Sequence, residues 1–198
     1  WWKKIALFTQ FLFGALFSKH LICDSIGISD FFKTKFKRTK NIFVAEYGSD
    51  LNTIEKCMDF NCEEYLKELK ITKYNYLLVV SRLEPENNVE IIIKGYLKSS
   101  QKSPLIIVGN TNTAYAKQLT QLASVNVRFI EGIYNQNKLS TLRFYCQAYF
   151  HGHSVGGTNP SLLEAMGSGN LTIAHDNVFN REVLDNKAYF FTNNNDVV

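Results

Sequence analysis

The sequence predicts an α/β protein with a Rossmann-like parallel β-sheet and helices on both faces. Three observations lead to this prediction. Short apolar runs rich in Val, Leu and Ile recur from about residue 74 onward, as expected for strands buried on both faces. Segments with helical spacing of apolar residues alternate with these runs. The chain of 198 residues, 45% hydrophobic and 20% charged, also has the composition of an ordinary globular protein.

Each expected strand has an apolar centre. In chain order the strands are YNYLLVVS (74–81), PLIIVG (104–109), VNVRFIEG (125–132), AYFHG (148–152) and NLTIAH (170–175). The expected helices are NNVEIIIKGYLKSS (87–100), TAYAKQLTQLA (113–123), NQNKLSTLRFYCQ (135–147) and one more after the loop that follows residue 151. Asn88 is available to cap the first of them. This alternation predicts repeated βαβ units, and hence a parallel sheet.

Residues 1–50 do not share this rhythm. HLICDS (20–25) and NIFVAEYGSD (41–50) are expected strands, joined by the basic segment KTKFKRTK (33–40), which we interpret as a solvated loop. WWKKIALFTQFLFGALF (1–17) is an expected helix, because its apolar run is too short to span a bilayer and no small-residue cleavage site follows. Since no initiator Met is present, we expect a piece of a longer protein in which this helix has its packing partner.

Charge and cysteine content narrow the classes of function only slightly. A net charge of +4 suits an anionic small molecule or a membrane surface as well as nucleic acid. The spacing of Cys23, Cys57, Cys62 and Cys146 matches no zinc-binding pattern. We therefore expect reduced thiols in a cytosolic protein.

Polar residues end the expected strands, and in a parallel sheet these ends meet at one edge, where ligands bind. The residues are Ser81 and Arg82, Gly109 and Asn110, Glu131 and Gly132, and the loop after His151. The sequence therefore predicts a binding site at this edge.

The loop HGHSVGGTNP (151–160) has features of a phosphate-binding segment. Gly156 and Gly157 permit close approach of a ligand to the backbone. Asn159 can cap the following helix and Pro160 suits its first position, so that N–H groups and the helix dipole face the site. The alternative is a tight, well-capped loop without a ligand.

Two charged residues complete the predicted site. Glu164 lies among apolar residues, where a carboxylate is costly unless it is paired; vicinal ribose hydroxyls are suitable partners. The alternatives are an exposed acid or a pair with an internal Arg or Lys. Arg82 could bind phosphate oxygens with two hydrogen bonds, or could instead pair with Glu84 or Glu86.

These residues carry a resemblance to a known family. VVSRLEPENN, LIIVGN, VRFIEGIY and HSVGGTNPSLLEAMGSGNLTIA, in this order and spacing, resemble the donor-binding half of family 4 retaining glycosyltransferases of the GT-B fold. Upstream, ICDSIGISDFF and IFVAEYGSD resemble that family's last N-domain strand and interdomain link. EPENN together with GHSVGGTNPSLLEAM is similar to a bacterial subgroup of rhamnosyltransferases of capsule and O-antigen assembly.

The resemblance assigns roles to single positions. The Arg that contacts the donor diphosphate falls on Arg82, our candidate catalytic residue, but the Lys that usually assists it is Asn87 here. Of two family glutamates separated by seven residues, the one that holds the ribose falls on Glu164 and the other falls on Gly156. The residues expected at the donor are Arg82, Asn87, Gly109, Asn110, Tyr134, His153, Gly156, Gly157, Thr158, Asn159, Ser161, Leu162 and Glu164. No metal ligands are expected.

Without a carboxylate at position 156, the sugar hydroxyls would be read by the loop backbone, by Thr158 or by His153. A histidine at a strand end is more often structural than catalytic, and of His151 and His153 the latter is closer to the loop.

The resemblance implies retaining, metal-independent transfer of a sugar, rhamnose in this subgroup, from a UDP- or dTDP-linked donor to a glycan or lipid-linked acceptor in cell-surface polysaccharide synthesis. The nucleotide sugar is a substrate, and we expect no cofactor and no nucleic acid. Residues 1–50 would be the tail of the acceptor domain and a connector, and 51–198 the donor domain without its last helices. This piece would be inactive alone. We expect a cytoplasmic protein, peripheral at the inner face of the membrane through the missing half.

Two other classes of protein fit the same architecture. A nucleotide-sugar epimerase also grips its substrate between two such domains, and would turn over the nucleotide sugar without an acceptor. A non-catalytic nucleotide-sugar-binding module would only bind it. A dinucleotide dehydrogenase is disfavoured, because no Gly-x-Gly-x-x-Gly follows the first strand.

Overall fold

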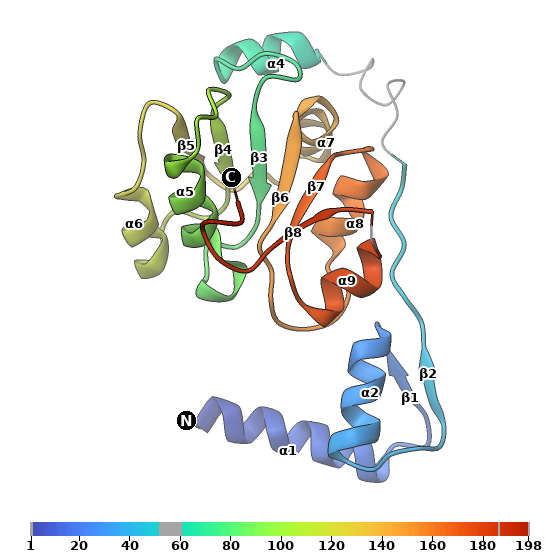
Figure 1. Ribbon diagram of the computed structural model, residues 1–198. Helices are drawn as coiled ribbons and strands as arrows, with labels where there is room; N and C mark the ends of the chain where they lie inside the picture. Colours follow the sequence, from blue (N-terminus) through green and yellow to red (C-terminus); the bar gives the residue numbers. More distant parts are fainter. Residues whose placement is uncertain (1, 52–60, 186, 198) are drawn as a thin grey trace.

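A six-stranded parallel sheet forms the centre of the protein (Figure 1). The computed structural model describes residues 2–51, 61–185 and 187–197. The strand order is β5-β4-β3-β6-β7-β8. The strands are β3 (Leu77–Val80), β4 (Leu105–Val108), β5 (Val127–Ile130), β6 (Ala148–His151), β7 (Thr172–His175) and β8 (Tyr189–Phe191). The five predicted strands are confirmed; β8 was not predicted, because its three residues carry too little pattern.

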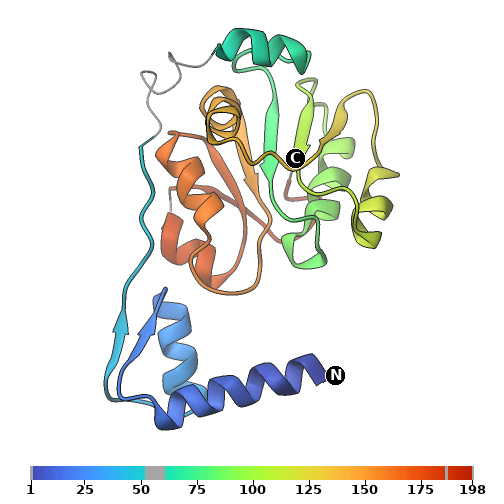
Figure 2. The ribbon, with the colours of Figure 1, turned by 180° about the vertical axis from the view of Figure 1, so that it is seen from behind.

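Helices cover both faces of this sheet, as predicted (Figures 1 and 2). They are α4 (Cys62–Glu68), the 3₁₀ turn η1 (Pro85–Asn87), α5 (Val89–Lys98), α6 (Ala114–Thr120), α7 (Gln136–Tyr145), α8 (Pro160–Gly167) and α9 (Val178–Leu184). Alternate strand residues enter two separate cores: Leu77 and Val79 pack with α5 and α6, whereas Leu78 packs with α4 and α7. This alternation is the period of two expected of a strand.

Side-chain caps fix where several helices begin. Thr113 Oγ1 accepts from Ala116 N at 3.1 Å, and Asn135 Oδ1 accepts from Lys138 N at 3.1 Å. The predicted cap on α5 is wrong. Asn88 stands before α5 with a φ of 48° and makes no side-chain cap; its amide instead donates to the carbonyl oxygen of Gly152 at 2.8 Å. A tertiary partner therefore outcompetes the local cap.

The N-terminal segment forms a small separate sheet. Both predicted strands are present: β1 (Leu21–Cys23) and β2 (Ile42–Val44) pair in parallel and pack with α1 (Trp2–Phe17) and α2 (Ile26–Lys35). The basic segment is only partly a loop, because α2 continues to Lys35. Ser25 caps the start of α2, and the positive charges of lysines in its last turn interact favourably with the negative end of the helix dipole. Within the described ranges, no helix is long and apolar enough to cross a membrane.

The N-terminal segment contacts the main domain at the start of α2. The Glu182 carboxylate on α9 accepts hydrogen bonds from the backbone N–H groups of Ile26 and Gly27, the latter at 2.9 Å. Thr158 Oγ1 donates to the carbonyl oxygen of Asp24 at 2.8 Å. Figure 1 shows α2 beside α9 at this contact. The loop before α8 is thus anchored from the N-terminal side.

Cys23 and Cys146 are buried free thiols. Burial raises the pKa of both groups, that of Cys146 to about 12, so both stay protonated at neutral pH. Cys57 lies outside the described residues.

The central strand β6 ends in a buried histidine. His151 is 4% exposed, and its Nε2 has no hydrogen-bond partner in the part of the chain that the structure describes. Burial, with a smaller contribution from His153, lowers the pKa of His151 to about 3. The folded protein therefore holds this imidazole neutral at physiological pH.

We predict that the free energy of unfolding falls as the pH is lowered from 7 to 5. In the unfolded chain the His151 imidazole is protonated below about pH 6.5, whereas in the folded protein it stays neutral down to a much lower pH. The free energy of unfolding therefore decreases below that pH, by up to about 1.4 kcal/mol per pH unit. His153 and His175, whose pKa values are also lowered by burial, add to this slope. Urea denaturation at several pH values measures it. His151→Phe should give a shallower slope, and an unchanged slope would contradict this account.

A second prediction concerns Gly152, which lies directly under the loop after β3. A Cβ atom at this position would overlap the backbone oxygen of Asn87. Gly152→Ala should therefore lower the free energy of unfolding by about 1–3 kcal/mol, the usual cost of overpacking. Gly14→Ala is the matched control, because nothing lies within 4 Å of its Cβ position on α1 and Ala favours a helix. Equal effects of the two substitutions in urea denaturation would refute this close approach.

Candidate functional site

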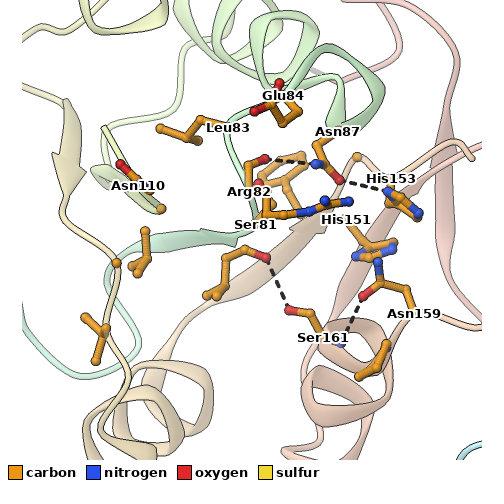
Figure 3. A pocket seen from close by; sticks show the side chains of 18 of the residues that line it. Ser81, Arg82, Leu83, Glu84, Asn87, Asn110, His151, His153, Asn159 and Ser161 are labelled. Atoms are coloured by element: carbon orange, nitrogen blue, oxygen red, sulfur yellow. Dashed lines mark hydrogen bonds between the residues drawn. The ribbon is translucent and has the colours of Figure 1, made fainter. Parts of the chain in front are cut away.

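A cavity of about 520 Å³ opens at the carboxyl ends of β3, β4 and β6 (Figure 3). The chain runs from β3 outward to β5 and then returns to the other side of β3 as β6, so the strand order reverses here. Such a reversal point is where ligands bind in open α/β sheets. Of the predicted donor residues, those that line the cavity are Arg82, Asn87, Gly109, Asn110, Tyr134, His153, Asn159, Ser161 and Glu164.

The start of α8 forms one wall. Asn159 Oδ1 accepts from Ser161 N at 2.9 Å and Pro160 is the first helical residue, as predicted. The cap occupies the N–H group of Ser161, one of the first-turn N–H groups that were expected to face the site. The Ser161 hydroxyl is held by the Tyr149 hydroxyl at 2.7 Å and by the Val80 carbonyl at 3.2 Å. Strand β6 and helix α8 are thereby fixed to the end of β3.

The glycine loop is placed differently from our prediction, because Gly156, Gly157 and Thr158 do not line the cavity. Gly156 does have a φ of 92°, the conformation that favours glycine. A Cβ on Gly157 would overlap the Asp24 carboxylate, so its close approach is to the N-terminal segment. Thr158 is buried against the same segment. Leu162 also lies away from the cavity, in a core cluster with residues of α9 and β7.

Arg82 follows β3 and is largely free. Its side chain is 76% exposed, and its guanidinium lies 3.8 Å from the Glu86 carboxylate. The alternative pairing with Glu86 therefore exists only as a long, exposed contact, which is weak. The guanidinium remains available to an anion in the cavity.

The loops after β4 and β5 form the opposite rim. A Cβ on Gly109 would overlap the backbone oxygen of Ser81, so this glycine permits close packing of two strand ends. Asn110 Oδ1 accepts from Asn112 N at 2.8 Å and closes the turn after β4. Tyr134 is 92% exposed at the mouth of the cavity. Its ring is thus an open flat surface.

Glu164 pairs with an internal arginine, which was one of the alternatives that the sequence left open. Its Oε2 lies 2.6 Å from an Nη2 atom of Arg143 on α7, whose side chain is 3% exposed, while Glu164 itself is 37% exposed. The same Arg143 nitrogen donates to Ser161 Oγ at 3.4 Å. The internal pair is therefore present, yet the carboxylate stays accessible from the cavity.

Sequence reasoning missed Arg143, although a signal existed. It lies between Leu142 and Phe144 in a predicted helix, and a guanidinium on the inner side of such a helix requires an acid. A second cavity of about 430 Å³ shares Arg143, Pro160 and Glu164 with the first. Glu164 thus stands between two cavities, the second bordered by residues 48–51.

Asn87 and His153 form a small network beside Arg82 (Figure 3). Asn87 is 4% exposed; its amide donates to the Arg82 carbonyl at 2.8 Å, and its Oδ1 lies 2.9 Å from His153 Nδ1. Burial lowers the pKa of His153, and the nearby charge of Arg82 lowers it further. At position 87 the cavity therefore has a buried amide with a structural role. Within the described segments, no three His, Cys, Asp or Glu side chains gather as a metal site.

Three solved structures illustrate the fold similarity. The chain superposes on HepE of Anabaena in complex with UDP and glucose with a TM-score of 0.82 and 17% identity, over 96% of this chain and 55% of HepE. A glycosyltransferase from Rickettsia africae superposes with a TM-score of 0.76 and 12% identity, over 90% of this chain and 51% of that protein. Sucrose-phosphate synthase of Thermosynechococcus elongatus superposes with a TM-score of 0.74 and 13% identity, over 91% of this chain and 47% of that protein. The chain therefore spans about half of each of these proteins.

No curated protein matches the chain. The sequence profile of the family described as glycosyl transferases group 1 matches residues 62–197, which contain the whole six-stranded sheet and the cavity. This chain belongs to the glycosyl transferases group 1 family.

Proposed function

We propose that the chain is the nucleotide-sugar-binding half of a retaining, metal-independent glycosyltransferase. The observation that carries this proposal is a single cavity with an exposed guanidinium, Arg82, at one strand end and an accessible carboxylate, Glu164, on the helix after another. A nucleoside diphosphate offers a diphosphate to the first group and ribose hydroxyls to the second. The similar fold of HepE, whose structure contains UDP and glucose, supports this choice.

The Arg143–Glu164 pair refines how the ribose would be held. Because Oε2 is engaged by Arg143, Oε1 is the oxygen that accepts a ribose hydroxyl, and the ion pair fixes its direction. The carboxylate is then positioned before the ligand arrives, which lowers the cost of ordering it. The exposed ring of Tyr134 at the cavity mouth suits stacking against the base.

Catalysis of this kind depends on positioning and on stabilising the leaving group. The bond from the anomeric carbon to the diphosphate oxygen breaks, and the acceptor hydroxyl forms the new bond on the same face while its proton passes to the departing diphosphate. Arg82, next to the departing diphosphate, would stabilise the charge that develops there. We further propose that the transferred sugar is rhamnose and that the acceptor is a glycan or lipid-linked molecule of cell-surface polysaccharide synthesis. The reaction would need no cofactor and would take place in the cytoplasm at the inner face of the membrane.

Arg82→Ala is predicted to weaken binding of UDP or dTDP by the full-length protein by about 1.5–3 kcal/mol, the contribution of a hydrogen bond to a charged group. Isothermal titration calorimetry measures this loss. Arg181→Ala is the matched control, because Arg181 pairs with Asp176 on the surface outside the cavity. Unchanged affinity in Arg82→Ala, with the fold intact, would exclude Arg82 from the diphosphate site.

Glu164→Gln is predicted to weaken binding of UDP by about 1–3 kcal/mol, because a hydroxyl donor would lose its charged acceptor. A 2′-deoxy nucleotide should lose less if the 2′-hydroxyl is the one held, so comparing UDP with 2′-deoxy-UDP isolates the contact. Equal losses would instead point to the 3′-hydroxyl or to the fold.

The control for this substitution is Glu131→Gln, at the end of β5, whose carboxylate bonds to Thr111 outside the cavity lining. Because Glu164→Gln also deprives the buried Arg143 of its partner, the free energy of unfolding must be measured in parallel. No loss of affinity for either nucleotide, in a folded variant, would remove Glu164 from the site.

A further inference from the structure

The hydrogen bonds of Asn87 determine which nitrogen of His153 carries the proton. The Asn87 NH₂ group must face the Arg82 carbonyl, which only accepts hydrogen bonds, so Asn87 Oδ1 faces His153. An amide oxygen is also only an acceptor, and Nδ1 of His153 must therefore carry a hydrogen. In the neutral imidazole, the lone pair then lies on Nε2.

The imidazole is held neutral and in place. Burial is the main cause of its lowered pKa. A backbone hydrogen bond with Val155 raises the pKa and is the next-largest effect; the Arg82 charge lowers it more weakly, and Glu86 has the smallest, raising effect. The backbone of His153 is anchored as well, because its carbonyl accepts from the side-chain amides of Asn177 and Asn180 at 3.0 and 2.9 Å. His153 thus presents a fixed acceptor nitrogen at neutral pH.

Nε2 is directed toward the glycine loop. It lies 4.0 Å from the position that a Cβ at Gly156 would occupy. With a φ of 92°, residue 156 is strained for any L side chain. The His153 ring therefore lies between Gly156 and the cavity of about 520 Å³, which it also lines.

We propose that Nε2 of His153 is a sugar-binding subsite that accepts a hydrogen bond from a hydroxyl of the transferred sugar, with Asn87 as the positioning residue that keeps this nitrogen unprotonated. This inference rests on the proposed function and deepens it. A bare Nε2 repels phosphate oxygens and attracts hydroxyl donors. The diphosphate consequently lies toward Arg82 and the sugar toward His153, at the two ends of the Asn87 network.

The test compares nucleotides with and without a sugar in the full-length protein. The substitution is His153→Asn, because an Asn amide can still donate to Asn87 Oδ1 at the place of Nδ1 but has no acceptor at the place of Nε2. Calorimetry with UDP, UDP-glucose, dTDP and dTDP-rhamnose gives the ratio of affinities with and without sugar. We expect affinity for UDP and dTDP to change less than twofold, and affinity for the accepted nucleotide sugar to fall about 3–10-fold, the scale of one neutral hydrogen bond.

Two further variants sharpen the result. His153→Gln, whose amide oxygen can reach the place of Nε2, should recover part of the affinity for the nucleotide sugar. His175→Asn is the matched control, because His175 ends the neighbouring strand β7 but does not line the cavity. It should leave the affinity ratio unchanged. A monodeoxy sugar donor that lacks the bound hydroxyl should make wild type and His153→Asn equal.

The outcomes separate the two levels of the proposal. Equal losses for nucleotide and nucleotide sugar in His153→Asn, or no loss for either, would overturn the sugar subsite while the nucleotide site stands. If the wild-type protein binds none of the four ligands, the proposed function fails and the subsite fails with it.

Discussion

The site depends on hydrogen bonds that clamp the loop after β3 to the loop after β6. The backbone N–H and the hydroxyl of Ser154 both donate to the Glu86 carbonyl at 2.9 Å, and Asn88 donates to the Gly152 carbonyl at 2.8 Å. Gly152 allows the two backbones to approach this closely. This clamp holds the loops that carry Arg82 and His153 beside one cavity.

A second constraint comes from burying a charge in the wall of the same cavity. Arg143 is almost fully buried, and its Nε has no hydrogen-bond partner among the described residues, which is costly. Glu164 offsets part of that cost and must stay oriented toward α7 to do so. The buried guanidinium therefore depends on a carboxylate that remains accessible from the cavity, and the ion pair sets the direction of that carboxylate.

The sequence predicted those features that depend on local pattern. The apolar runs predicted five strands, and the Asn159-Pro160 pair predicted the start of α8. Partners distant in the chain could not be read, because they arise only once the sheet forms. The Asn88 side chain bonds to the carbonyl oxygen of Gly152, 64 residues away, instead of capping α5. Gly157 packs against Asp24 rather than facing a ligand. Arg143 was missed for the same reason, although its apolar neighbours required a partner.

The glycine loop joins these constraints because it is held from both sides. On one side His153 faces Gly156, and on the other Thr158 and Gly157 contact the N-terminal segment at Asp24. The contact of Glu182 with the start of α2 fixes that segment against α9. A Cβ at residue 157 would overlap the Asp24 carboxylate, and residue 156 has a φ of 92°, so both positions favour glycine. The composition of this loop therefore follows from packing between two parts of the chain.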